Sequence, residues 1–173
     1  MAQKITIEAA NRFGREGFVE RFGPLYENSP WVAEQAYLRR PFDGVDGLHA
    51  AMVSAVDAAP EARQMALIRA HPDLAGKAAV AGELTRESAR EQSSAGLNRL
   101  TPEEYQEFRR LNLAYKERFG FPLIFAVREH TKESILAGAQ ERLRNPRQRE
   151  VQTALAEISK IARLRLEDLV ESG

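Results

Sequence analysis

The 173 residues carry 25 Lys and Arg against 25 Asp and Glu, and this neutral balance argues against a nucleic-acid-binding protein, which usually needs a basic face. The absence of cysteine excludes disulfides, thiolate nucleophiles and cysteine-based metal sites. The longest apolar run, residues 121–127, is much shorter than the ~20 residues that cross a membrane, and the N-terminus lacks an apolar signal segment. We therefore expect a cytoplasmic protein with one domain over residues 1–173, since domains usually have roughly 100–200 residues.

Helix signals dominate residues 1–70, where glycine and proline separate short amphipathic stretches. Serine, threonine and aspartate accept hydrogen bonds from the free amides of a first helical turn, and proline fits the first helical position. We therefore predict helices from a Thr6 cap to Phe13, over residues 14–22, from a Ser29 cap with Pro30 to Leu38, from an Asp43 cap to Val56, and from Pro60 to Ala70.

His71 is the histidine in the most unusual backbone setting. It precedes Pro72, and a proline pushes the residue before it out of the helical region. We therefore expect His71 just past a helix end, on a rigidly turned backbone that can aim its side chain into a pocket. The other two histidines are expected on an amphipathic helix, for His49, and at a solvated helix entrance, for His130.

Three polar residues share one face of the next helix, which Thr85 is expected to cap. Ser88, Glu91 and Gln92 stand at positions i, i+3 and i+4, so their side chains project together. Such a triplet is most often the side of a helix that faces solvent. The opposite face offers only Ala89 and small neighbours, and this weakens the solvent interpretation without excluding it.

The C-terminal half continues the helical pattern. The apolar run 121–127 has no second strand to pair with, so we expect an extended segment that leads into a helix. The last helix carries a stripe that we expect to pack in the core, with a helical partner such as a second copy of the chain as the alternative. The stripe is Val151, Leu155, Ile158, Ala162, Arg165 and Leu169, at a 4-3-4-3-4 spacing. The predicted helices run from a capping box at Thr101 and Glu104 to Gly120, from a Thr131 cap to Leu143, and from Asn145-Pro146 to Leu169. The fold class is therefore all-α: a single multi-helical domain with short connections and a long C-terminal helix.

Several sequence blocks follow one another between residues 71 and 128: His71 to Lys77 (H-P-D-L-A-G-K), Glu83 to Thr85, Ser88 with Glu91-Gln92, Ala95 to Leu97, Leu111-Asn112, Tyr115, and Phe119 to Arg128. In this order they resemble the family of OHCU decarboxylases, where OHCU is 2-oxo-4-hydroxy-4-carboxy-5-ureidoimidazoline, an intermediate of urate breakdown. Any one block alone is unspecific, and their combination is highly specific. The resemblance implies an all-helical, cofactor-free, usually homodimeric enzyme that converts OHCU to (S)-allantoin and CO2.

By position, the resemblance makes His71 the catalytic histidine and Glu91 the carboxylate that works with it. It implies no metal. Leu123 stands where an aromatic residue is common in the family, and Glu129-His130 where small or basic residues are usual, so the pocket shape is expected to differ in detail. The residues that match substrate-binding positions are Pro72, Ser88, Gln92, Phe121, Leu123, Ile124 and Arg128.

The chemistry suits these residues. Loss of CO2 leaves a carbanion that can delocalise into the adjacent ring carbonyl or imine, so no pyridoxal, thiamine or metal electron sink is required. A histidine can move the proton, and Glu91 would orient the His71 imidazole and favour its protonated form. The planar guanidinium of Arg128 can hold an anionic group.

Two other classes of protein remain open. A helical interaction protein that dimerises through residues 146–170 would need no site. A metal-dependent hydrolase of a cyclic amide or ureide would use His71, Asp73 and Glu91, which is a thin donor set without H-E-x-x-H spacing. The sequence has no glycine-rich phosphate loop and no G-x-S-x-G, so nucleotide binding and serine hydrolysis have no support.

Overall fold

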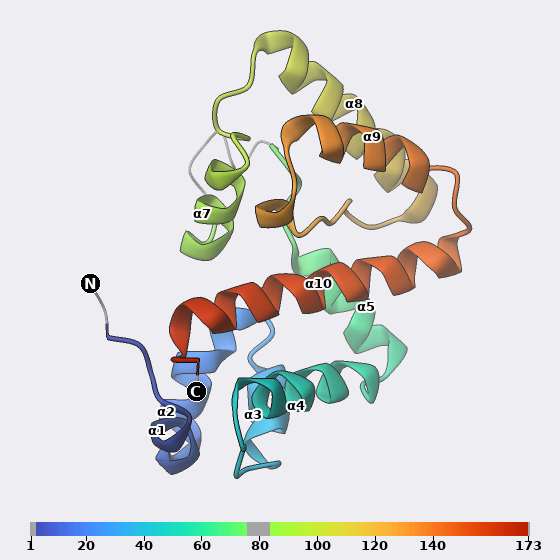
Figure 1. Cartoon of the computed structure of the whole chain (residues 1–173). Helices are drawn as coiled ribbons and strands as arrows, with labels where there is room; N and C mark the ends of the chain where they lie inside the picture. The colour runs from blue at the N-terminus through green and yellow to red at the C-terminus, as the bar shows by residue number, and fades with distance from the viewer. Residues whose placement is uncertain (1–2, 76–83, 173) are drawn as a thin grey trace. The chain divides into compact units, whose positions relative to one another are not determined.

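The computed structural model describes residues 3–75 and 84–172. Over these residues the chain forms nine α-helices and two short 3-10 helices (Figure 1), and its one β-type pairing is an isolated bridge between Ile5 and Val170. The predicted all-α fold class is confirmed. None of the helices in these ranges is long and apolar enough to span a membrane. The contacts divide the chain into two compact units, Met1–Ala70 with Ser159–Gly173, and His71–Ile158.

The first unit is built from short helices around an aromatic and aliphatic core. Phe18 is fully buried and contacts the rings of Phe22 and Phe42, while Leu48 and Met52 fill the core from the longest of these helices. Its elements are α1 (Ile7–Arg12), α2 (Arg15–Phe22), η1 (Gly23–Leu25), α3 (Trp31–Tyr37), α4 (Val45–Asp57), α5 (Glu61–Ala70) and the last turns of α10 (Arg147–Leu169).

Of the three side-chain caps predicted in this unit, one is confirmed and two are wrong. The Thr6 hydroxyl accepts from the amide of Ala9, as predicted. Ser29 does not cap α3, because Pro30 is the N-cap residue and the Ser29 hydroxyl donates instead to the Glu27 carbonyl at 2.8 Å. Asp43 does not cap α4 either. Gly44 takes the N-cap position in an extended conformation, which leaves Asp43 one residue too early.

The second unit begins at His71 and holds α7 (Arg86–Ser94), α8 (Pro102–Phe119), η2 (Val127–Glu129), α9 (Lys132–Arg142) and the first turns of α10. The predicted threonine caps at Thr85, Thr101 and Thr131 are all confirmed. Both hydrogen bonds of the capping box at Thr101 form, and Gly120 ends α8 with a φ of 81°. These local signals fix where α7, α8 and α9 start.

The apolar run after Gly120 leads into a helix without forming a strand, as predicted. Residues 122–126 form no helix, strand, turn or bend, and η2 follows directly. All five of these residues are buried. A buried backbone of this kind needs hydrogen-bond partners other than a neighbouring strand, since unpaired buried amides and carbonyls are costly.

The buried face of α10 is more polar than predicted. Val151 and Leu155, expected in the core, are half-buried, because in its first half the helix turns Glu150, Ala154 and Glu157 inward instead. The second half buries Arg165 among aliphatic residues, at a position that the sequence analysis assigned to the apolar stripe. The fully or nearly buried residues of this half are Ile161, Ala162, Arg165 and Leu166.

Candidate active site

His71 lies where the sequence predicts it, directly after α5 ends at Ala70. Its side chain is buried, with 7% exposure, and Pro72 beside it is half-buried. A buried imidazole next to a rigid X-Pro link has a restricted orientation. The Gly76 and Lys77 part of the H-P-D-L-A-G-K motif lies outside the described residues.

The polar face of α7 is its buried face. Ser88, Glu91 and Gln92 are 5%, 8% and 5% exposed, whereas Ala89 is exposed. The solvent interpretation of this triplet is therefore wrong. Burial of a carboxylate, an amide and a hydroxyl on one helical face costs free energy unless polar groups meet them. The triplet consequently marks a polar interior site in the second unit.

Gln92 joins α7 to the residues that follow His71 and Pro72. Its Nε2 donates to the Asp73 carbonyl at 3.2 Å, and its Oε1 accepts from the Ala75 amide at 2.9 Å. Ala75 has a φ of 52°, an uncommon conformation for a residue with a side chain. The Gln92 amide thus holds this loop in a conformation that it rarely takes alone, and the loop holds His71.

Two residues of α8 hold the same loop. Asn112 is buried and donates from Nδ2 to the Leu74 carbonyl at 2.7 Å. Lys116 contacts both carboxylate oxygens of Asp73, at 2.8 and 2.9 Å. The resemblance included Asn112 without giving it a role, and it did not include Lys116. Their i, i+4 spacing on one helix face is a signal that could have paired them.

Arg128 lies on η2, which packs against α7. Its side chain is exposed, in contrast to the buried face of α7. The three other predicted substrate-binding residues of this region, Phe121, Leu123 and Ile124, are all buried. The second unit therefore packs α7 against both the loop after His71 and the turn that carries Arg128.

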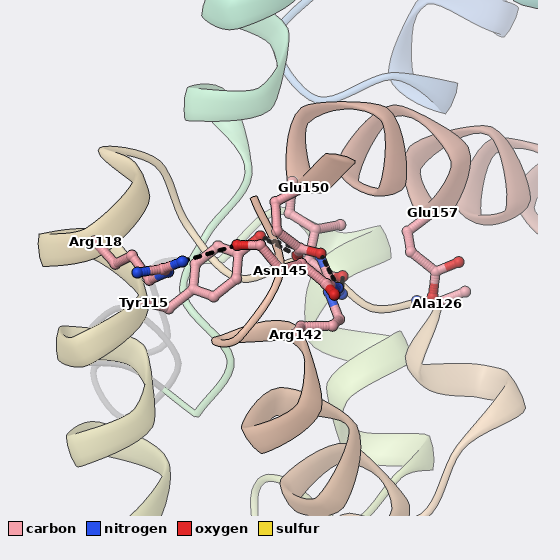
Figure 2. Close-up of polar contacts among 8 residues, drawn as sticks. Tyr115, Arg118, Ala126, Arg142, Asn145, Glu150 and Glu157 are labelled. Atoms are coloured by element: carbon pink, nitrogen blue, oxygen red, sulfur yellow. Dashed lines mark hydrogen bonds and ion pairs between the residues drawn. The ribbon is translucent and has the colours of Figure 1, made fainter. Parts of the chain in front are cut away.

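A buried charged cluster that the sequence analysis missed lies in the same unit (Figure 2). Glu150 is fully buried and accepts from the Tyr115 hydroxyl at 2.6 Å, the Arg142 Nε at 2.7 Å and the Asn145 Nδ2 at 2.8 Å. Burial raises the pKa of Glu150, but the hydrogen bonds from Tyr115, Asn145 and Arg142 outweigh it and hold the pKa below its usual value. Burial, with the bond to Glu150, raises the pKa of Tyr115.

The first unit contains a second buried ion pair. Arg165 of α10 contacts Glu27 at 3.0 Å, and the two side chains are only 5% and 2% exposed. Arg165 also donates to the carbonyls of Pro24 and Leu25 in η1. A charged residue inside an apolar stripe is the sequence signal for such a pair.

The metal-hydrolase alternative finds no support in the part of the chain that the structure describes. No group of three His, Asp or Glu side chains there is placed to hold a metal ion. His71, Asp73 and Glu91 therefore do not form a donor set of that size. Asp73 is engaged with Lys116 instead.

Comparison with known proteins shows the family to which this chain belongs. The model of the OHCU decarboxylase family, a class of carboxy-lyases, matches residues 11–167. The chain is 43% identical to the OHCU decarboxylase of Halalkalicoccus jeotgali over 96% of this chain and 92% of that protein. It is also 43% identical to that of Haloferax volcanii, over 98% of both. A crystal structure of (S)-allantoin synthase superposes with a TM-score of 0.78 at 28% identity, over 96% of this chain and 54% of that chain. The chain belongs to the OHCU decarboxylase family.

Proposed function

We propose that this chain decarboxylates OHCU with His71 and Glu91 as the acid–base pair and with Arg128 as the anchor for the anionic substrate. The chain is an OHCU decarboxylase, a carboxy-lyase of urate degradation whose product is (S)-allantoin. The observation that supports the residue roles is the inward polar face of α7, joined through Gln92 to the loop that follows His71. A surface helix would present this face to water.

The reaction needs one bond broken and one proton placed. The bond between the ring carbon and its carboxylate breaks, CO2 leaves, and the electron pair delocalises into the neighbouring ring carbonyl or imine. The carbon that lost CO2 carries a hydroxyl, which gives up its proton as this carbon becomes a ring carbonyl of allantoin. Protonated His71 donates a proton to the neighbouring ring carbon that carries the ureido group, while Glu91 orients the imidazole and stabilises its charged form. Because the histidine approaches from one face only, a single enantiomer forms.

The remaining residues bind the substrate. Ser88 and Gln92 hold polar atoms of the ring and the ureido group. The Gln92 amide has two N–H donors and two acceptor lone pairs, and the loop uses one of each, so one of each remains for the ligand. Arg128 is an exposed residue of η2, and its guanidinium binds the substrate carboxylate. The pocket walls are Pro72, Phe121, Leu123 and Ile124.

In solution, we expect the enzyme to work as a cytoplasmic homodimer with no cofactor, folded as a single domain over residues 1–173. Light scattering coupled to size-exclusion chromatography measures whether the protein is a dimer. A mass near twice 19.4 kDa supports the dimer, and a mass near 19.4 kDa contradicts it.

The test of the proposed function adds the purified protein to OHCU freshly made from urate and follows the loss of its ultraviolet absorbance. OHCU decays unaided, so only an increase in rate that scales with protein concentration supports the function. Decay at the spontaneous rate contradicts it. A folded Glu91→Gln variant tests the residue roles, because it should lose at least ~10²-fold in turnover if Glu91 supports the proton transfer.

A further inference from the structure

The buried segment 122–126 has its backbone held by side chains instead of by a neighbouring strand. Arg142 of α9 donates from Nη1 to the Ile124 carbonyl at 2.5 Å. Glu157 of α10 accepts from the Ala126 amide at 3.4 Å (Figure 2). A carbonyl and an amide that would otherwise be buried and unpaired thus find partners, at the cost of placing two charged residues in the interior.

These two contacts come from two different helices and bind backbone groups only two residues apart, at Ile124 and Ala126. They therefore fix the backbone in the middle of the segment.

The Arg142 guanidinium contacts a carboxylate, a hydroxyl and an aromatic ring as well as the Ile124 carbonyl. Its Nε contacts the fully buried Glu150, its Nη2 lies 3.3 Å from the Tyr115 hydroxyl, and its guanidinium lies 4.7 Å from the ring centroid of Phe125. A guanidinium is planar and has five donors, so one side chain can bind the carboxylate and the carbonyl together. An ammonium group offers no such fork.

We propose that Arg142 is a positioning residue for substrate binding. Held by Glu150, it binds the Ile124 carbonyl and so fixes the backbone that places the side chains of Leu123 and Ile124 against the cyclic ureide. This inference rests on the proposed function, in which Phe121, Leu123 and Ile124 line the pocket. It adds to that assignment a residue outside the pocket, because Arg142 acts on the ligand only through the Ile124 carbonyl that it binds.

Two variants test the proposal. Arg142→Lys keeps the charge beside Glu150 but cannot bind the carboxylate and the carbonyl together. The double variant Arg142→Met with Glu150→Gln removes both charges, so it leaves no unpaired buried ion and guards against a folding failure of the single variant. We expect KM for OHCU to rise at least ~10-fold in both, with kcat changed less than about threefold, because the lost contacts align the substrate without taking part in the bond-breaking step.

The matched control is Arg118→Met. Arg118 is an exposed arginine that donates to the carbonyl of Asn145 at 3.0 Å, and Asn145 in turn binds Glu150. Arg118 therefore lies next to the Arg142 cluster without contacting segment 122–126. Its KM should stay at the wild-type value. A rise in KM equal to that of Arg142→Lys would show that the loss of any arginine next to this cluster weakens substrate binding, and it would overturn the proposal.

Amide hydrogen exchange gives the second readout, which a general loss of stability would not reproduce. In Arg142→Lys, a peptide covering residues 121–127 should exchange at least ~10-fold faster while peptides from α8 keep wild-type rates. Wild-type exchange in that peptide, or a wild-type KM in either folded variant, overturns the inference alone. If the wild-type protein itself fails to accelerate OHCU loss, the proposed function fails and the inference falls with it.

Discussion

The substitution Tyr115→Phe allows a specific prediction about stability, because it removes only the hydroxyl group and keeps the aromatic ring. The ring stays in contact with Phe119 at 4.6 Å and Phe121 at 5.7 Å between centroids, so the packing is kept. What is lost is the 2.6 Å hydrogen bond to Glu150 and the longer contact with Arg142. Glu150 keeps its bonds from Arg142 and Asn145.

The magnitude follows from the kind of bond that is lost. A hydrogen bond to a charged group contributes about 1.5–3 kcal/mol, and the Glu150 carboxylate is fully buried, so no water replaces the hydroxyl. We therefore expect Tyr115→Phe to lower the free energy of unfolding by ~2 kcal/mol at neutral pH. For a chain of this size, that change lowers Tm by roughly 4–8 °C.

The effect depends on pH in a defined direction. The pKa of Glu150 is lowered from the ordinary carboxyl value of 4.5, so its stabilisation is present above that value and is lost as pH falls through the lower, folded pKa. Removing the Tyr115 hydroxyl raises the folded pKa back toward the ordinary value. The difference between wild type and variant should therefore be full at pH 7 and should shrink as pH falls below both pKa values.

Urea denaturation followed by far-ultraviolet circular dichroism, at neutral and acid pH, measures both effects. Tyr105→Phe, a half-buried tyrosine earlier on α8, is the matched control. A Tyr115→Phe variant within ~0.5 kcal/mol of wild type at pH 7 would refute the reasoning, since surface changes alone give differences of that size.

Three further predictions concern the site. His71→Asn should lower kcat at least ~10²-fold in a folded protein, and near-normal steady-state turnover would remove His71 from the mechanism. Arg128→Lys should mainly raise KM for OHCU, because it loses the fork that grips a carboxylate, and unchanged kcat and KM would place Arg128 outside the site. Asn112→Ala leaves the Leu74 carbonyl without its donor and should cost ~1–3 kcal/mol in urea denaturation, together with a lower kcat as the loop after His71 loosens. An unchanged stability would show that Asn112 does not hold that loop.

The boundaries of the helices were predictable wherever the signal is local. A capping threonine accepts a hydrogen bond from the backbone amide three residues later, and this bond depends only on the local sequence. The caps at Thr85, Thr101 and Thr131 were therefore predicted correctly. Ser29 was predicted as a cap because a proline follows it, but its hydroxyl donates to the Glu27 carbonyl instead. Local chemistry therefore predicts where a helix can begin, while the competing partners decide between neighbouring residues.

The candidate site was predictable only in part. Spacing places Ser88, Glu91 and Gln92 on one face, but whether that face turns inward depends on contacts with distant segments, such as the loop at Asp73 and Ala75. The pair of Arg142 and Glu150 depends likewise on how α9 packs against α10. The carbonyl that Arg142 binds is also distant in sequence, since Ile124 lies eighteen residues earlier. No periodicity within one helix contains that information.

The circular dichroism of the allantoin formed from fresh OHCU tests the central claim most directly. With catalytic amounts of the wild-type protein, we predict rapid formation of (S)-allantoin alone, because His71 delivers its proton from one face of the carbanion. Folded His71→Asn should give only the slow, spontaneous product without an optical signal. Racemic allantoin from the wild-type protein, or (S)-allantoin formed at the wild-type rate by His71→Asn, would contradict the account.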